Sequence, residues 1–164
     1  MKKIILLLTV AIISISCTQA QTKFKKEALE NVMKTTANTT ISFEEILKKY
    51  KGKTIVIDVW ASWCSDCIKG MPKVKALQKQ YPDATYLFIS MDKTFEAWQK
   101  GIEKYNLQGE HYLTSDGMKG IFGKSIELDW IPRYMVVDKK GRIDLFKVIE
   151  ADDEKLIHTL NKQK

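Results

Sequence analysis

The sequence is short of cysteine, histidine and arginine, and each shortage narrows what the protein can do. Its 164 residues include three cysteines and two isolated histidines, His111 and His158. A closed tetrahedral zinc site needs four cysteine or histidine ligands, and the isolated histidines do not complete a site with the cysteines. A structural zinc site is therefore disfavoured. Only two arginines accompany the many lysines. Proteins usually recognise bases and phosphates through arginine side chains, and this chain has few of them. Its net charge of +7 therefore indicates a solvated lysine surface and no nucleic-acid partner.

The sequence also lacks an apolar run long enough to span a membrane. Residues 4–13 are apolar apart from one threonine, follow the basic Met1-Lys2-Lys3 and precede small and polar residues up to Ala20. This layout is typical of a signal peptide, and the run is too short for a transmembrane helix. We therefore expect residues 1–20 to be removed and the mature chain to lie in the periplasm.

A lipoprotein signal is the alternative for this N-terminus. Cys17 would then be acylated, and the protein would be attached to the membrane through it. The motif is imperfect because Ser14 stands where such signals usually carry leucine. Simple cleavage after Ala20 is therefore favoured.

Either form of processing leaves two cysteines, Cys64 and Cys67, for chemistry in the mature domain. Exported proteins often use disulfides to hold a fold together. A bridge across two intervening residues closes almost no loop, however, so its entropic stabilisation is small. The spacing therefore favours a reactive pair over a structural one.

The rest of the chain has the length and patterning of one α/β domain. We expect residues 21–41 to be an N-terminal extension, either a frayed helix or a short hairpin, and residues 42–164 to be the domain. Apolar and β-branched runs predict strands over 54–60, 84–91, 133–138 and 142–149. Apolar spacing and N-caps predict helices over 42–50, 64–81, 94–105, 116–122 and 152–163. This order predicts a mixed β-sheet with helices on both faces.

The predicted strand-to-helix junction places Cys64 at the N-terminus of a helix. Unpaired N–H groups and the helix dipole stabilise a thiolate there, so the pKa of Cys64 should fall. Cys67 lies one turn further along and should be more buried. This asymmetry suits an exchange in which Cys64 attacks a partner disulfide and Cys67 then resolves the mixed disulfide.

Asp58 is the only acid in the apolar run before the two cysteines. A lone carboxylate is costly to bury as an ion, so desolvation should raise its pKa toward neutrality. That pKa suits a general base for the Cys67 thiol. The alternative is a structural carboxylate bonded to backbone or water near the strand end.

These residues resemble the active site of the thioredoxin superfamily. The stretch Val59-Trp60-Ala61-Ser62-Trp63-Cys64-Ser65-Asp66-Cys67 is followed by a proline, Pro72, inside the helix, and Asp58 precedes Cys64 by six residues. Ile131-Pro132 stands just before a strand, at the position of the family's cis-proline. The signal-like N-terminus and the stretch from residue 116 to 142 resemble the exported TlpA/ResA-like branch.

The resemblance implies a thioredoxin-like three-layer sandwich and a protein-disulfide reductase. Cys64, Cys67 and Asp58 would be catalytic, while Trp63, Ile131 and Pro132 would contact an extended substrate segment. The Cys64–Cys67 disulfide would replace any cofactor or metal. The implied partners are disulfide-containing exported proteins and an electron donor, a membrane thiol–disulfide carrier, with the chain itself a monomer.

The sequence departs from the family pattern between the cysteines, where Ser65-Asp66 replaces the common Gly-Pro. The charge of Asp66 should oppose thiolate formation and make the protein more reducing. Two other functions stay open at this stage. One is a disulfide oxidase or isomerase that uses the same site, and the other is a non-enzymatic copper-binding chaperone that uses the two thiolates.

Overall fold

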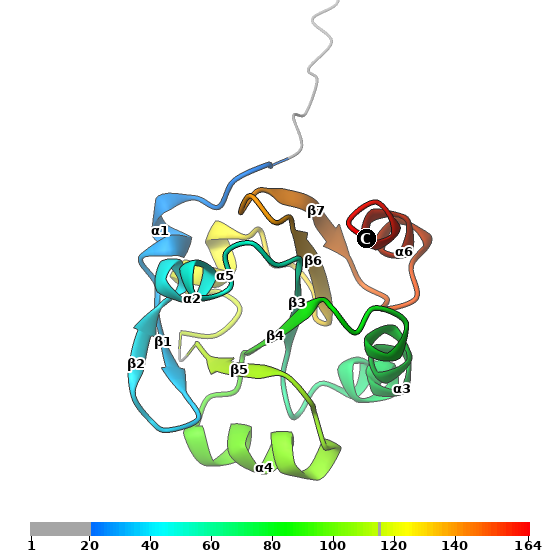
Figure 1. Cartoon of the computed structure of the whole chain (residues 1–164). Helices are drawn as coiled ribbons and strands as arrows, with labels where there is room; N and C mark the ends of the chain where they lie inside the picture. The colour runs from blue at the N-terminus through cyan, green and yellow to red at the C-terminus, as the bar shows by residue number, and fades with distance from the viewer. Residues whose placement is uncertain (1–20, 115) are drawn as a thin grey trace, which may run out of the picture.

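A computed structural model describes residues 21–114 and 116–164, and its strands form one mixed sheet (Figure 1). The sheet order is β2-β1-β5-β4-β3-β6-β7. The strands are β1 (Val32–Thr35), β2 (Thr40–Ser42), β3 (Ile55–Trp60), β4 (Thr85–Ser90), β5 (Glu110–Leu113), β6 (Arg133–Val137) and β7 (Ile143–Val148). The helices are α1 (Lys26–Leu29), α2 (Phe43–Lys49), α3 (Ser65–Gln80), α4 (Phe95–Tyr105), α5 (Ile121–Ser125) and α6 (Glu154–Asn161). Within these two ranges, no helix is long and apolar enough to cross a membrane.

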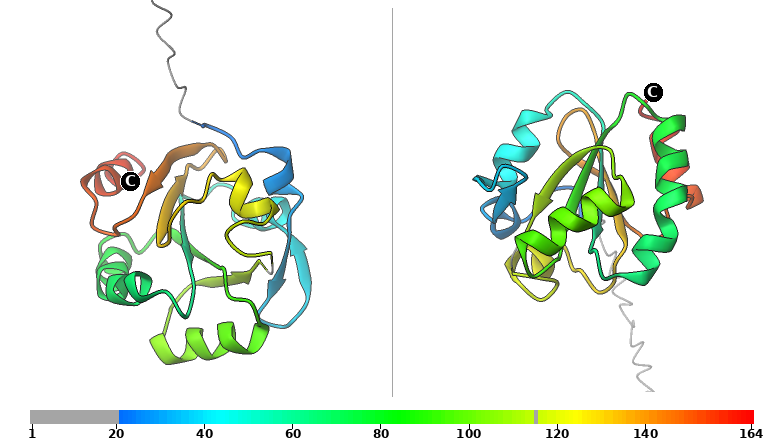
Figure 2. Two further views of the ribbon diagram at one scale, coloured as in Figure 1. Left: turned by 180° about the vertical axis from the view of Figure 1, so that it is seen from behind. Right: turned by 90° about the horizontal axis from the view of Figure 1, so that it is seen from below.

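The strand β3 lies inside the sheet, and the two cysteines follow its C-terminal end. It pairs in parallel with β4 and antiparallel with β6, and all its residues are buried. The crossovers through α3 and α4 advance along the sheet in one direction, which places both helices on the same face. Figures 1 and 2 show α3, α4 and α6 on that face and α1, α2 and α5 on the other. The predicted fold class, a mixed sheet between two helical layers, is confirmed.

Residues 21–41, predicted as an extension, form part of the same sheet and core. The strand β1 pairs antiparallel with both β2 and β5. Phe24 packs edge-on against Phe43 of α2, with ring centroids 4.9 Å apart. The segment thus contains both a short helix and a hairpin, where the sequence left a choice between the two.

The helix predicted over 116–122 is wrong in position, because α5 begins only at Ile121. Gly117 has a φ of +65°, which no continuous right-handed helix allows. The carboxylate of Asp116 instead accepts hydrogen bonds from Asn31 and from the backbone N–H of Phe122. Hydrogen bonds of the Asp116 side chain therefore hold this segment, and the helix begins only after it.

Candidate active site

The two cysteines form a disulfide at the junction of β3 and α3. Cys64 is the N-cap of α3, and its Sγ accepts a hydrogen bond from the Cys67 backbone N–H at 3.1 Å. The two Cα atoms are 5.3 Å apart. An N-cap position brings both the orphan N–H groups and the positive end of the helix dipole to the Cys64 sulfur. In the reduced protein the same geometry favours the Cys64 thiolate.

Cys64 is less accessible than a helix N-terminus suggests. It is 6% exposed, against 3% for Cys67, so both sulfurs are largely buried in the oxidised protein. The cover comes from the loop before β6, because the carbonyl oxygen of Ile131 lies 3.5 Å from Cys64 Sγ. A partner must therefore approach beside this loop.

The Ile131–Pro132 peptide bond is cis, as the family resemblance implies. At this bond the chain lies directly against Cys64. A cavity of about 350 Å³ opens there, lined by Trp63, Cys64, Trp130 and Ile131 among others. Trp63 and Trp130 are 59% and 55% exposed, so two large aromatic residues flank the buried sulfur. This groove suits an extended apolar segment, which keeps substrate contact as the hypothesis for Trp63, Ile131 and Pro132.

Asp58 lies in the middle of β3, on the face that α3 covers. Its side chain is buried, and its Oδ1 has no hydrogen-bond partner among the described residues. Desolvation alone raises the pKa of Asp58 to about 8. The general-base role stays a hypothesis, but the carboxyl has the environment that this role requires.

Tyr134 is a neighbour of Asp58 that sequence reasoning missed. It stands directly opposite Asp58 in the β3–β6 ladder, so the two side chains share a face. Its hydroxyl reaches toward α3, 3.7 Å from the point where a Cβ on Gly70 would lie, and it lines a cavity of about 240 Å³ with Asp66 and Pro132. Burial raises the pKa of Tyr134, so the ring stays a neutral phenol near Asp58.

Asp92, just after β4, is a second buried carboxylate that the sequence did not reveal, and it bonds the loop before Cys64. It accepts from the backbone N–H and the hydroxyl of Ser62, at 3.0 and 2.7 Å, and from the Ser90 hydroxyl at 2.7 Å. Ser62 belongs to the loop that presents Cys64. Helix α4 packs closely on this loop, since a Cβ on Gly101 would come within 2.7 Å of Ser62 Cβ. Asp92 thus fixes the loop from β4.

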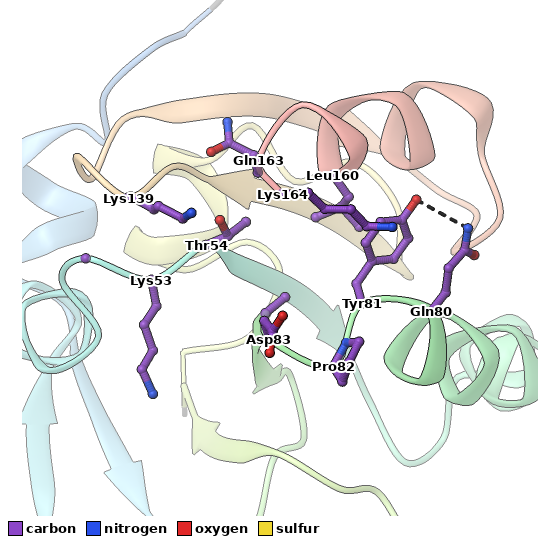
Figure 3. A pocket seen from close by; sticks show the side chains of 12 residues that line it. Lys53, Thr54, Gln80, Tyr81, Pro82, Asp83, Lys139, Leu160, Gln163 and Lys164 are labelled. Atoms are coloured by element: carbon purple, nitrogen blue, oxygen red, sulfur yellow. Dashed lines mark hydrogen bonds between the residues drawn. The ribbon is translucent and has the colours of Figure 1, made fainter.

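The other cavity of note lies at the opposite end of the sheet. It measures about 370 Å³ and is lined mainly by Lys53, Thr54, Tyr81, Leu160 and Lys164 (Figure 3). Thr54 precedes β3 and Tyr81 follows α3, whereas the dithiol lies where β3 ends and α3 begins. No cysteine or histidine lines this cavity, so we place the chemistry at the dithiol end.

The histidines do not approach the dithiol in a metal-binding arrangement. In residues 21–114 and 116–164, no group of three histidine, cysteine or acidic side chains could hold a metal ion. The His111 ring stacks on Phe88, and its Nε2 is hydrogen-bonded to the Leu107 carbonyl oxygen at 3.1 Å. Burial lowers the pKa of His111. His158 is exposed on α6.

Comparison with known proteins agrees with this geometry. A model of the thioredoxin-like family matches residues 52–143, more than half of the chain. The chain belongs to the thioredoxin-like family. It is 29% identical over 154 residues to the thiol–disulfide oxidoreductase ResA of Bacillus thuringiensis subsp. konkukian. The aligned region covers 87% of this chain and 87% of ResA.

Solved structures give the same picture. The thioredoxin domain of a Bacteroides vulgatus thiol–disulfide oxidoreductase superposes with a TM-score of 0.65 and 25% identity, covering 80% of this chain and 90% of that one. A thiol–disulfide oxidoreductase from Bacteroides fragilis superposes with a TM-score of 0.68 at 21% identity, over 80% and 94% of the two chains, and shows the shared fold. With the dithiol in place, the thioredoxin-like chain is an enzyme of thiol–disulfide exchange.

Proposed function

We propose that this enzyme is an exported protein-disulfide reductase. The observation that carries the proposal is the Cys64–Cys67 pair at the start of α3, with the Cys67 amide directed at Cys64 Sγ. This amide and the helix dipole stabilise a thiolate on Cys64 when the pair is reduced. Cys64 is therefore the attacking sulfur and Cys67 the resolving one.

The reaction is a two-step disulfide exchange. The Cys64 thiolate attacks one sulfur of a substrate disulfide, and the other substrate sulfur leaves as a thiolate that takes a proton from solvent. The Cys67 thiol then gives its proton to Asp58 and attacks Cys64 Sγ, which releases the second substrate sulfur. Two electrons pass to the substrate, and the enzyme is left with the Cys64–Cys67 disulfide. A membrane thiol–disulfide carrier then reduces it for the next cycle.

Asp66 supports the reductive direction. This carboxylate stands between the two cysteines, is 47% exposed and has only a loose ion pair with Lys69, 3.7 Å away. Its negative charge opposes the Cys64 thiolate and so destabilises the reduced form. A strongly oxidising dithiol owes its potential to a stabilised reduced form, so Asp66 moves the protein in the opposite direction.

Export is the second part of the proposal, and it depends on residues 1–20, which lie outside the described residues. We propose cleavage after Ala20 and a periplasmic, monomeric enzyme whose substrates are disulfide-containing exported proteins. The ResA relatives and the Bacteroides structures carry the name thiol–disulfide oxidoreductase, which fits such substrates. The intact mass of the mature chain tests this step: a chain that begins at Gln21 supports cleavage, and a lipid on Cys17 supports membrane attachment.

The equilibrium redox potential of Cys64/Cys67 tests the direction. It is measured on the mature chain by alkylation and mass shift in defined thiol buffers. A potential of about −270 mV supports a reductase, and one of about −120 mV makes the protein an oxidant. Asp66→Asn should move the potential toward the oxidising side. Cys67→Ser should accumulate mixed disulfides through Cys64, while the absence of any exchange would point to thiolate metal binding.

A further inference from the structure

We infer that Arg133 is a positioning residue, which holds the loop of residues 126–131 against the dithiol. The inference rests on the proposed exchange function and assigns a specific task to one buried side chain. Arg133 is the first residue of β6 and directly follows the cis Ile131–Pro132 bond. Its side chain has no solvent exposure at all.

The guanidinium of Arg133 makes its hydrogen bonds and its ion pair, among the described residues, within this loop. Its Nη1 donates to the carbonyl oxygen of Ile126 at 3.2 Å, and its Nη2 donates to that of Glu127 at 3.3 Å. Nη2 also pairs with the carboxylate of Asp129. Glu127 has a φ of +53°, a left-handed conformation that costs free energy in a residue other than glycine. Arg133 therefore bonds the backbone where the loop most needs support.

Stability alone does not explain an arginine at this position. Burying a guanidinium is costly, and the Nε of Arg133 has no hydrogen-bond partner among the described residues. The rest of β6 is uncharged, Tyr-Met-Val-Val, so a neutral side chain of similar volume would avoid the cost of burying this guanidinium. What an apolar residue cannot do is bond two carbonyls and a carboxylate of one loop at once.

The loop that Arg133 holds forms one wall of the groove beside the disulfide. Asp129, Trp130 and Ile131 line the cavity of about 350 Å³ together with Cys64. The Ile131 carbonyl oxygen lies 3.5 Å from Cys64 Sγ. If Arg133 is removed, this wall loses its fixed position. A protein substrate that lies along the wall then loses orientation, whereas a small disulfide that touches only the sulfur does not.

The chain contains a control for the loss of an arginine–aspartate pair, in which the burial is reversed: Arg142 is 60% exposed and pairs with a buried Asp138, whereas Arg133 is buried and pairs with an exposed Asp129. Arg142 pairs with Asp138 at 2.7 Å, and Arg133–Asp129 and Arg142–Asp138 have the same spacing of four residues. The Arg142 pair lies in the turn between β6 and β7, at the far end of β6 from the dithiol. Arg142→Met thus removes an arginine–aspartate pair without touching the loop.

The test compares a protein disulfide with a small one. The proteins compared are the mature chain and its Arg133→Met, Arg133→Lys and Arg142→Met variants. For each protein, kcat and KM are measured for the reduction of insulin, and a rate constant is measured for the reduction of hydroxyethyl disulfide. We expect Arg133→Met to raise KM for insulin about tenfold and to leave the small-disulfide rate within about twofold. Arg133→Lys should recover part of the loss, and Arg142→Met should change neither rate by more than about twofold.

Two results would overturn the inference. One is an unchanged KM for insulin in Arg133→Met, and the other is an equal loss with both disulfides after correction for the folded fraction. If Arg133→Met does not fold, Asp129→Asn replaces it, because that side chain is 60% exposed, and Lys147→Met is its control, because Asp129 also pairs with Lys147. We then expect KM for insulin to rise about threefold, and no rise rejects the inference. A wild-type chain that reduces neither disulfide would instead reject the proposed function.

Discussion

Two buried carboxylates, one in β3 and one just after β4, differ in their hydrogen bonds. Asp58 on β3 and Asp92 after β4 are 5% and 1% exposed. Asp92 accepts three hydrogen bonds from Ser62 and Ser90. Asp58 has an oxygen with no partner among the described residues. A bonded carboxylate fixes structure, whereas an unbonded one is free to take and release a proton.

The contrast has a physical cause in how each charge is compensated. Desolvation without compensating bonds raises the pKa of Asp58 to about 8, so this carboxyl exchanges its proton near neutral pH. Around Asp92, two hydroxyls and a backbone N–H replace the lost water. Asp58 thus costs stability, which the proposed general-base role would explain, whereas Asp92 bonds the loop that presents Cys64.

The largest expected effect is on the pH dependence of stability. The folded-state pKa of Asp58 is raised from its ordinary value of 3.8 to about 8. Ionisation of the buried carboxyl therefore costs no stability below about pH 4, and this cost grows as the pH rises toward 8 and is constant above it. Relative to Asp58→Asn, the oxidised wild type should lose up to about 1.4 kcal/mol of unfolding free energy per pH unit, about 4 kcal/mol from pH 5 to 8. Urea unfolding at several pH values measures this difference, and parallel curves for the two proteins would contradict it.

The next effect is on the resolving step. Asp58→Asn removes the proposed base, so resolution of the mixed disulfide by Cys67 should slow about 100-fold at pH 7. The rise of the wild-type rate through pH 8 should also disappear. Rapid quench with acid and alkylation follows the mixed disulfide directly. Asp92→Asn is the control, because it should keep the rise with pH; the same profile in all three proteins would rule out Asp58 as the base.

The contrast between the two acids was only half visible in the sequence. Asp58 interrupts an apolar run, so its burial could be predicted from its neighbours. Asp92 follows a strand, where an acid usually marks a surface turn. Its partner Ser62 stands 30 residues away, and only the parallel pairing of β3 with β4 brings the two together. Arg133 was missed for the same reason, since its partners belong to a loop that had no predicted shape.

The fold shows the same division. The strands β3, β4, β6 and β7 and the long helices were predictable because their apolar periodicity is strong. The short strands β1, β2 and β5 are partly exposed, and they depend on the pairing of β1 with β2 and β5 and of β5 with β4. The start of α5 depends on the φ of Gly117 and on the bonds of Asp116. The short strands and the start of α5 depend on tertiary contacts, which cannot be predicted from the local sequence.

A smaller effect should come from Asp92 itself. Asp92→Asn keeps the shape but replaces one acceptor oxygen by an N–H donor, which opposes a hydroxyl or a backbone N–H. We expect a loss of about 2 kcal/mol in unfolding free energy at pH 7, because a buried bond to a charged group is broken. Urea unfolding measures it. A loss that follows the pH profile of Asp58 would show that the two carboxylates are not independent.

The smallest effect should come from Ser62→Ala, which separates the two bonds that tie the active-site loop to Asp92. The substitution removes the hydroxyl bond of 2.7 Å and keeps the backbone bond of 3.0 Å. Ser62 is partly exposed, so water can replace the lost donor, and we expect a cost of only about 1 kcal/mol. Ser90→Ala is the matched comparison, because the fully buried Ser90 hydroxyl both donates to the Asp92 carboxylate and accepts from its N–H. It should cost more than Ser62→Ala in urea unfolding. If Ser62→Ala costs as much, the loop depends on the hydroxyl; if it costs nothing, the backbone bond alone holds the loop to Asp92.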